Sequence, residues 1–238
     1  MADIVLTLRS ARDEALDTTT FVFEAEGLGD HVPGQYLLLK LDVPEDPRRG
    51  SRSFTIANAP SGGRVTITSR MRPSSLFKRG LAALHPGAQV SAKGPLGRFV
   101  MPEGDTPALL LAGGIGVTPF RAMLEHAIAS GRSRPVTLVV SDRVPEASVY
   151  REEIDRWASE HAWLKVVRTV TRPSPGLSPW RGRTGRIDAA LLREALPSPG
   201  EGVALVAGPP AFVDGIVAVL AALGLPPDRV RSERFIGY

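Results

Sequence analysis

The amino-acid sequence predicts two domains, an antiparallel β-barrel with Greek-key-like connections and then an α/β, Rossmann-like domain with a five-stranded parallel sheet. Up to about residue 102, short runs of alternating apolar and polar residues are separated by glycine and proline. After residue 106, continuous apolar runs take turns with helix-like segments. We therefore expect domains over residues 1–102 and 107–238, and a chain of 238 residues is long enough for both.

Six strands and one helix are expected in the barrel. The runs TFVFEAE and RVTITS alternate cleanly, and the turns PGQ, SGG, HPGA and GPLG separate neighbouring runs. The stretch SSLFKRGLAALH has the spacing of a helix. The expected strands are DIVLTLRSA, TTTFVFEAEG, GQYLLLKLDV, RSFTIANAP, RVTITSR and QVSAKGPLG.

In the second domain, strands and helices are expected to alternate. PALLLAG is apolar without alternation, which indicates a strand covered on both faces, and a glycine turn and the helix TPFRAMLEHAIAS follow it. Because parallel strands need long crossovers, this order predicts a parallel sheet of the nucleotide-binding type. The other expected strands are PVTLVVSD, WLKVVRTVTR, GVALVAG and RVRSERFIGY, and the other helices are EASVYREEIDRWASEH, RIDAALLREAL and PAFVDGIVAVLAALG.

Cysteine is absent, which excludes disulfides, thiolate nucleophiles and the usual cysteine ligands of zinc and iron–sulfur clusters. The four histidines, His31, His85, His126 and His161, are scattered without the spacing of a metal site. We expect no bound metal, and any redox chemistry must come from an organic cofactor.

Charge is distributed unevenly along the chain. Residues 1–46 carry 3 basic and 10 acidic side chains, whereas residues 47–102 carry 10 basic side chains and no acidic one. Such a window indicates binding of an anionic group, which can be a phosphate, a nucleic acid or an acidic protein. The alternative is that these arginines only keep exposed strands hydrated.

Neither a targeting segment nor a membrane span is expected. The first 17 residues contain acidic side chains and no long apolar run, so a cytoplasmic location follows by default. The longest apolar segment, GVALVAGPPAFVDGIVAVLAALGL, is interrupted by Gly-Pro-Pro and Asp214, which indicates a strand, a turn and a helix. We expect a monomer.

Two glycine-bearing turns follow strands of the second domain. In AGGIGVTP, Ala112 to Pro119, glycines allow close approach of a ligand to the backbone, and Thr118 can cap the next helix. The turn is neither GxGxxG nor a Walker loop, which disfavours kinases and ATPases of that type. VAGPPAF is the second turn, and the carboxyl ends of parallel strands face one crevice. The pair therefore favours a dinucleotide or nucleotide ligand over the alternative of tight structural turns.

Four motifs in this order resemble the ferredoxin–NADP reductase family, in the broad sense of FAD-containing oxidoreductases, here without an iron–sulfur domain. They are RSFT at residues 52–55, GGIGVTP, AGPP and the terminal ERFIGY, supported by PGQY and GPLGRF. The resemblance covers nearly the whole chain. It implies that FAD lies across the barrel, that NAD(P)H binds the second domain, and that the two meet at the domain interface.

By this resemblance, Arg52 binds the FAD diphosphate, the Phe54 ring packs against the isoalloxazine, and the Thr55 hydroxyl lies near flavin N5. Because side chains alternate along a strand, Phe54 and Thr55 point to opposite faces. Either the backbone bends there or the flavin crosses the end of the strand.

The resemblance extends FAD binding to three further places. Thr68 contacts the flavin edge through its backbone. RMRPSSLFK lacks the family's usual glycine, so Ser74 or Ser75 presents a hydroxyl and backbone amides to phosphate at the helix start. The terminal Tyr238 corresponds to an aromatic residue that stacks on the flavin and is displaced by nicotinamide.

Glu233 matches an acidic position near the flavin and joins Thr55 as a catalytic candidate. The alternative is a surface carboxylate paired with Arg231 or Arg234. The complete set assigned to FAD is Arg52, Ser53, Phe54, Thr55, Thr68, Ser74, Ser75, Thr118 and Tyr238.

For NAD(P), the resemblance places the pyrophosphate and nicotinamide on the first glycine turn and the other side of the nicotinamide on the second. Many relatives have a cysteine just before the second turn, where this chain has Ala207. The residues assigned are Gly113, Gly114, Gly116, Thr118, Gly208 and Pro209.

Discrimination between the two coenzymes needs a cation for the 2′-phosphate or a carboxylate for the 2′-hydroxyl. Ser141 and Arg143 follow one strand, and Thr171 and Arg172 follow the next, at a position resembling the family's Ser-Arg phosphate clamp. Asp142 lies beside them and can serve NADH. We favour NADP(H), because arginine prefers phosphate.

The resemblance implies an enzyme in which hydride passes from NAD(P)H to FAD and electrons then pass to a separate acceptor. An acidic ferredoxin or flavodoxin fits the basic window. One alternative is a reductase of free flavin or another small acceptor. Another is a non-enzymatic nucleic-acid-binding barrel, which is disfavoured because no aromatic residues are interleaved among the arginines.

Overall fold

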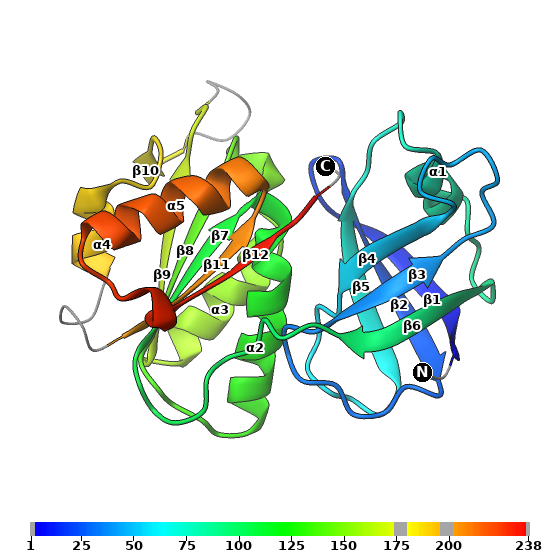
Figure 1. The fold of residues 1–238 in the computed structure, drawn as a ribbon, viewed down its shortest axis with the longest axis horizontal. Coiled ribbons are helices and arrows are strands. Elements are labelled where there is room, and N and C mark those ends of the chain that lie inside the picture. Colours follow the sequence, from blue (N-terminus) through cyan, green and yellow to red (C-terminus); the bar gives the residue numbers. More distant parts are fainter. Residues whose placement is uncertain (1–2, 174–179, 196–201, 237–238) are drawn as a thin grey trace. The chain divides into compact units, whose positions relative to one another are not determined.

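The structure is a computed structural model that describes residues 3–173, 180–195 and 202–236. Its contacts divide the chain into two compact units. The first unit contains residues 1–101 together with 118–129, and the second contains residues 102–117 together with 130–238. Figure 1 shows the helices and strands of both units, coloured along the sequence from blue at the N-terminus to red at the C-terminus.

The first unit is built on a six-stranded antiparallel sheet in the order β4-β3-β6-β1-β2-β5 (Figure 1). All six predicted strands and the predicted helix are confirmed. The two edge strands of this sheet, β4 and β5, are also linked to each other. The backbone N–H of Ala57, just after β4, donates to the carbonyl of Thr66 on β5 at 2.8 Å, which closes the barrel. The elements are β1 (Asp3–Ala15), β2 (Thr18–Glu26), β3 (Tyr36–Lys40), β4 (Ser51–Thr55), β5 (Arg64–Arg70), α1 (Leu76–Ala82) and β6 (Gln89–Leu96).

Alternation along the strands builds the core of this barrel. Phe21 and Phe23 on β2 and Leu37 and Leu39 on β3 are almost completely buried, while the residues between them are more exposed. Phe77 from α1 joins the same cluster. The helix α2 (Thr118–Ala129) also belongs to this unit.

The second unit contains a parallel sheet in the order β10-β9-β8-β7-β11-β12. The five predicted strands are present, and a sixth, β10, has only two residues, so the predicted count was one too low. Its residues pair with Thr169 and Val170, but a two-residue strand within WRGRTGR has no apolar run that would reveal it. The strands are β7 (Ala108–Gly113), β8 (Val136–Asp142), β9 (Leu164–Val170), β10 (Arg183–Thr184), β11 (Val203–Gly208) and β12 (Val230–Arg234).

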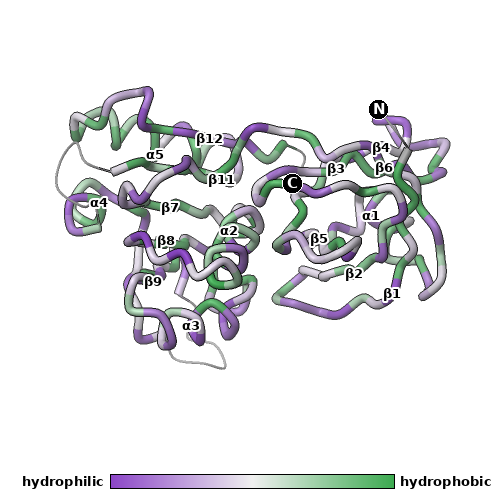
Figure 2. The backbone as a smooth tube through the Cα atoms, turned by 90° about the horizontal axis from the view of Figure 1, so that it is seen from below, coloured by the Kyte–Doolittle hydropathy of each residue, from purple (hydrophilic) through white to green (hydrophobic). Residues whose placement is uncertain are grey.

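Helices cover the sheet of the second unit. One core cluster joins Leu109 and Val206 of the sheet to Leu192 and Val213 of α4 and α5. Figure 2 shows β7 and β11 as mostly hydrophobic strands, as expected for strands covered on both faces. The helices are α3 (Arg151–Glu160), α4 (Ala189–Ala195) and α5 (Pro210–Ala222), with 3₁₀ turns at Gly114–Val117, Pro145–Ala147 and Pro227–Arg229. Among the described residues, no helix has the length and apolar character needed to span a bilayer.

Candidate functional site

Arg52 on β4 forms a two-pronged ion pair with a residue that sequence reasoning did not single out. Its Nη2 and Nη1 donate to the two carboxylate oxygens of Asp46, at 2.6 and 2.8 Å, and Nη1 also donates to the Ser51 carbonyl at 2.8 Å. The Asp46 side chain is 1% exposed, and that of Arg52 is 16% exposed. The guanidinium lies over the Phe77 ring, 5.2 Å from its centroid. Arg52 is therefore held in one orientation.

The rest of the motif is split by the pleat of β4. Phe54 is half-buried and stacks on Phe77 with ring centroids 5.8 Å apart, whereas Thr55 is buried and Ser53 is exposed. Thr55 is the last residue of the strand, and Ala57 already pairs with Thr66 of β5 instead of with β3. The backbone N–H of Ile56 still donates to the Gln35 carbonyl at 2.9 Å, so the chain passes from β3 to β5 between Ile56 and Ala57, close to the place where the sequence requires either a bend or a strand end.

A group of cations lies near Lys78, and Arg52 is one of them. Lys78 on α1 is 6% exposed, and its Nζ donates to the Arg70 carbonyl at 2.5 Å. Burial, and then the nearby charges of Arg72, Arg52 and Arg70, lower the pKa of Lys78 to about 8. Arg52 pairs with Asp46, and a bound anion would lower the repulsion among the cations of this group. The cluster fits a diphosphate.

The two candidate serines at the start of α1 have different roles. Ser75 is the N-cap, and its Oγ accepts the backbone N–H of Lys78 at 3.3 Å. Ser74 is exposed. On β5, the buried Thr68 hydroxyl is hydrogen-bonded to that of Thr20 at 2.7 Å. Both threonines lie on the face of the sheet opposite Phe21 and Ile67, which pack in the barrel core.

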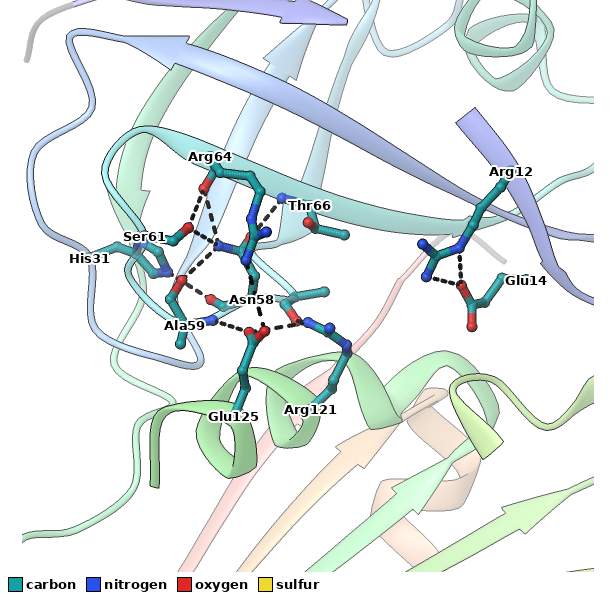
Figure 3. A network of polar contacts seen from close by, with 11 residues as sticks. Arg12, Glu14, His31, Asn58, Ala59, Ser61, Arg64, Thr66, Arg121 and Glu125 are labelled. Carbon is teal, nitrogen blue, oxygen red and sulfur yellow. Dashed lines mark hydrogen bonds and ion pairs between the residues drawn. The ribbon is translucent and has the colours of Figure 1, made fainter. Parts of the chain in front are cut away.

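Asn58 organises the loop that follows the motif (Figure 3). Its Oδ1 accepts the backbone N–H of Thr66 at 2.6 Å, and its Nδ2 donates to the carbonyls of Ala59 and Arg64 at 2.7 and 3.1 Å. His31 Nε2 donates to the Asn58 carbonyl at 2.9 Å, and burial lowers the pKa of His31. Asn58 lies in the expected strand RSFTIANAP, but its bonds to the backbone could not be predicted from spacing.

Two charged side chains of α2 hold the same loop. Arg121 Nη1 donates to the Ala57 carbonyl at 2.6 Å, and the Glu125 carboxylate accepts the backbone N–H of Ala59 at 2.6 Å (Figure 3). The two side chains also form an i,i+4 ion pair at 3.3 Å. The segment after Thr55 is therefore fixed on both sides, which limits the freedom of the Thr55 backbone.

In the second unit, the first glycine turn is shaped by close contacts. A Cβ atom on Gly113 would lie 2.7 Å from the Phe212 ring, and one on Gly116 would lie 2.1 Å from the Ala207 carbonyl oxygen. Gly114 has φ of +55° and open space where a side chain would be. The backbone of Gly114 is thus accessible to a ligand. Thr118 is not the N-cap that was predicted, because the 3₁₀ turn runs directly into α2 and Thr118 is its first residue.

The structure brings the two glycine turns together. Gly208 has φ of +153°, and a Cβ atom there would lie 3.0 Å from the Gly113 carbonyl oxygen. Pro209 is exposed at the N-cap of α5. The carbonyl of Gly208 accepts the backbone N–H of Phe235, which ties the chain after β12 to the same place.

The four residues proposed for the 2′-phosphate are also brought together. The backbone N–H and hydroxyl of Thr171 donate to the Asp142 carbonyl at 2.9 and 3.4 Å, and the Arg172 N–H donates to the Arg143 carbonyl at 2.8 Å. Both arginines are exposed, Ser141 is half-buried, and Asp142 as a whole residue is 6% exposed.

A cavity of about 500 Å³ lies beside β9, and sequence reasoning missed it. Arg151 lies over the Trp180 ring at 5.5 Å and near Asp155, while Arg168 donates to Asp155 at 2.8 Å. The run WRGR was the available signal, since it places two arginines next to an aromatic residue. The lining residues are Pro145, Arg151, Asp155, Val166, Val167, Arg168, Trp180, Arg181, Gly182 and Arg183.

Glu233 lies on β12, opposite Ala207 in the β11–β12 register. Burial raises the pKa of Glu233 to about 7, and its Oε2 is buried without a hydrogen-bond partner among the described residues. Arg234, one of the partners considered above, instead pairs with Asp214 at 2.7 Å. Glu233 is therefore not a carboxylate paired with Arg234 at the surface. Tyr238 lies outside the described residues.

Comparisons with known proteins identify both halves of the chain. Residues 5–101 match the oxidoreductase FAD-binding domain, and residues 110–218 match the oxidoreductase NAD-binding domain. A flavohemoprotein of Deinococcus radiodurans is 30% identical over 223 residues, which are 91% of this chain and 55% of the relative. The ferredoxin–NADP reductase B of Sorangium cellulosum is 29% identical over 241 residues, covering 96% of this chain and 91% of the relative.

A solved structure supports the same fold. An Amycolatopsis cytochrome P450 reductase superposes with a TM-score of 0.84 at 25% identity, covering 98% of this chain and 70% of that chain. The chain spans about half the length of the flavohemoproteins that it matches. Because an FAD-binding barrel precedes an NAD-binding parallel sheet over nearly its whole length, the chain belongs to the ferredoxin–NADP reductase-like family of oxidoreductases.

Proposed function

We propose that this protein is an FAD-dependent NADPH reductase that passes electrons to a separate acidic electron-transfer protein, such as a ferredoxin or flavodoxin. The observation that carries the proposal is the cation cluster around Arg52 on the barrel, which suits the diphosphate of FAD. When bound, FAD supplies the chemistry that the side chains lack, by accepting a hydride and releasing electrons one at a time.

The residues of the chain have binding and orienting roles. Arg52 and the cations near it hold the diphosphate, Phe54 offers an apolar ring surface, and Thr55 offers a hydroxyl at the strand end. The accessible backbone at Gly114 suits the close approach of a pyrophosphate, as glycine turns after parallel strands commonly provide.

The preference for NADPH is supported by the strand ends of β8 and β9. Arg143 and Arg172 are exposed and adjacent through their backbones, so their side chains can approach a 2′-phosphate. Asp142, the candidate for a ribose 2′-hydroxyl, is a buried residue with an exposed fraction of 6%, which disfavours contact with the ribose. The arginine-lined cavity beside β9 adds further positive charge to this unit.

The acceptor is proposed from charge and from a relative. The window 47–102, with 10 basic and no acidic side chains, offers complementary charge for a weak encounter with an acidic protein. The Sorangium relative is a ferredoxin–NADP reductase by name.

The first test is the absorption spectrum of the purified protein. We expect a yellow protein whose flavin absorbance bleaches under anaerobic NADPH, with about one FAD per chain after heat release of the cofactor. A colourless protein that fails to bind added FAD would overturn the proposal.

A further inference from the structure

We propose that Asp46 is a positioning residue that presents Arg52 to the FAD diphosphate. The inference deepens the proposed function and rests on it, because it takes Arg52 as a ligand of the diphosphate. Asp46 is the last carboxylate before the 56-residue basic window, and the motif resemblance gave it no role.

The hydrogen bonds of Arg52 leave a particular pair of donors available. A guanidinium has five N–H groups. Both on Nη1 and one on Nη2 are used by Asp46 and by the Ser51 carbonyl. Within the described part of the chain, the groups without an acceptor are Nε–H and the second Nη2–H. These two point in parallel along one edge and form the fork that binds a phosphate through two oxygens.

Asp46 is itself rigid, so it can fix the guanidinium before a ligand arrives. Its Oδ2 accepts the backbone N–H groups of Arg48 and Gly50, both at 3.0 Å. The hydrogen-bonded Arg52 guanidinium, and then these backbone bonds, hold the pKa of Asp46 below its ordinary value. On the other side, the Phe77 ring lies under the guanidinium. The arginine is thus constrained by a carboxylate at its end and by a ring at its face.

The charge of Asp46 has an opposing effect that makes the inference testable. A carboxylate next to an anion site repels the anion, so Coulomb energy alone predicts that removal of Asp46 tightens FAD binding. If Asp46 instead acts by fixing the orientation of Arg52, its removal should weaken FAD binding. The reason is that the Arg52 side chain then loses its conformational freedom before FAD binds and not on binding. Lys78 and Arg72 lie near enough to keep the cluster cationic with Asp46 present, which favours the orientation effect.

The experiment is a double-mutant cycle read by the dissociation constant of FAD from the full-length apoprotein, followed by flavin fluorescence. Asp46→Asn retains an oxygen acceptor for the two backbone amides but loses the charge that holds Arg52. We expect Asp46→Asn to weaken FAD binding about tenfold and Arg52→Ala about tenfold to a hundredfold, in line with charged hydrogen bonds. In the Arg52→Ala background, Asp46→Asn should change the dissociation constant of FAD less than about twofold, because residue 46 then has no guanidinium to position.

A control separates positioning from general damage. Asp188→Asn alters another carboxylate that accepts a backbone N–H, from Leu191 at 2.8 Å in the second unit, and it should leave FAD binding unchanged. Unchanged or tighter FAD binding by Asp46→Asn overturns the role of Asp46, while a weakened Arg52→Ala variant still supports the role of Arg52. The role of Asp46 is also overturned if Asp46→Asn weakens FAD binding equally in the wild-type protein and in the Arg52→Ala variant. The effect would then not depend on Arg52. Wild-type protein that binds no FAD instead overturns the proposed function.

Discussion

The carbonyl oxygen of Ala207 lies 2.1 Å from the point at which a Cβ atom on Gly116 would stand. A side chain at Gly116 therefore requires the end of β11 to move. Gly208, the residue after Ala207, is in turn close to Gly113, so these contacts set the spacing between the two glycine turns. The β7–β11 ladder, in which Ala207 pairs with Ala112, places the two turns side by side, and the absence of side chains at the glycines allows their close approach.

Gly116→Ala should disturb both the fold of the second unit and its nucleotide binding. Overpacking against backbone is expected to destabilise the protein by about 1–3 kcal/mol and to weaken NADP⁺ binding. Urea unfolding and a coenzyme titration measure the two effects. The matched control is Gly215→Ala within α5, where a Cβ atom meets open space, and it should stabilise by about 0.5–1 kcal/mol. Equal behaviour of the two variants would contradict the steric argument.

Thr55→Ala should separate cofactor retention from turnover. The variant keeps Arg52 and the cation cluster, so FAD should stay bound. Loss of the hydroxyl at the end of β4 should slow hydride transfer by about tenfold or more. Stopped-flow bleaching of the flavin by NADPH measures the step. Ser10→Ala removes an exposed hydroxyl on β1 and should change neither quantity; a Thr55→Ala variant as fast as Ser10→Ala would exclude a catalytic role.

Coenzyme choice should depend on the two strand-end arginines. Arg143→Ala and Arg172→Ala should each lower kcat/KM for NADPH by about tenfold, because each removes a charged contact to phosphate, and should leave NADH nearly unaffected. Arg193→Ala, an exposed change on α4, serves as the control. Equal kcat/KM of the unmodified protein for both coenzymes would refute the preference.

The nature of the acceptor should appear in the salt dependence. Reduction of an acidic ferredoxin should fall steeply as ionic strength rises from about 0.01 to 1 M, since the screening length shortens from about 30 to 3 Å. Reduction of an uncharged quinone should change little over the same range. A salt-independent ferredoxin rate would favour a reductase of small acceptors.

The local parts of the structure could be predicted from the sequence. Alternation around Phe21 and Phe23 indicated a strand with one buried face, and the unbroken apolar run ending at Gly113 indicated a strand with two. These signals depend on neighbours a few residues apart. The two-residue β10 has no such signal and depends on its pairing with β9.

The interactions that orient the candidate site are different, because they join residues far apart in sequence or depend on the path of a loop. Arg121 reaches Ala57, 64 residues away, and Glu125 reaches Ala59, 66 residues away. Asp46 is only six residues from Arg52, yet the turn that returns it to β4 has no pattern of its own. Sequence reasoning could name Arg52, but the group that fixes its direction required coordinates.

Glu233 should make the stability of the protein depend on pH. Burial raises its pKa to about 7, above the ordinary value of 4.5. Between these values the native state keeps a proton that the unfolded state releases, so the free energy of unfolding falls as pH rises through this window and stays lower above it. Glu233→Gln cannot ionise and should be free of this loss. Urea unfolding of both proteins from about pH 5 to 8 should show the variant gaining relative stability up to about pH 7.

The control for this prediction is Asp214→Asn, which removes an exposed carboxylate paired with Arg234 on the same unit. The stability of Asp214→Asn relative to the unmodified protein should not grow across the same window, because an exposed ion pair contributes little. A constant difference between Glu233→Gln and the unmodified protein at every pH would mean that the carboxyl is ionised throughout. The unpartnered Oε2 would then have to be hydrated in solution, and Glu233 could not carry a proton near neutral pH.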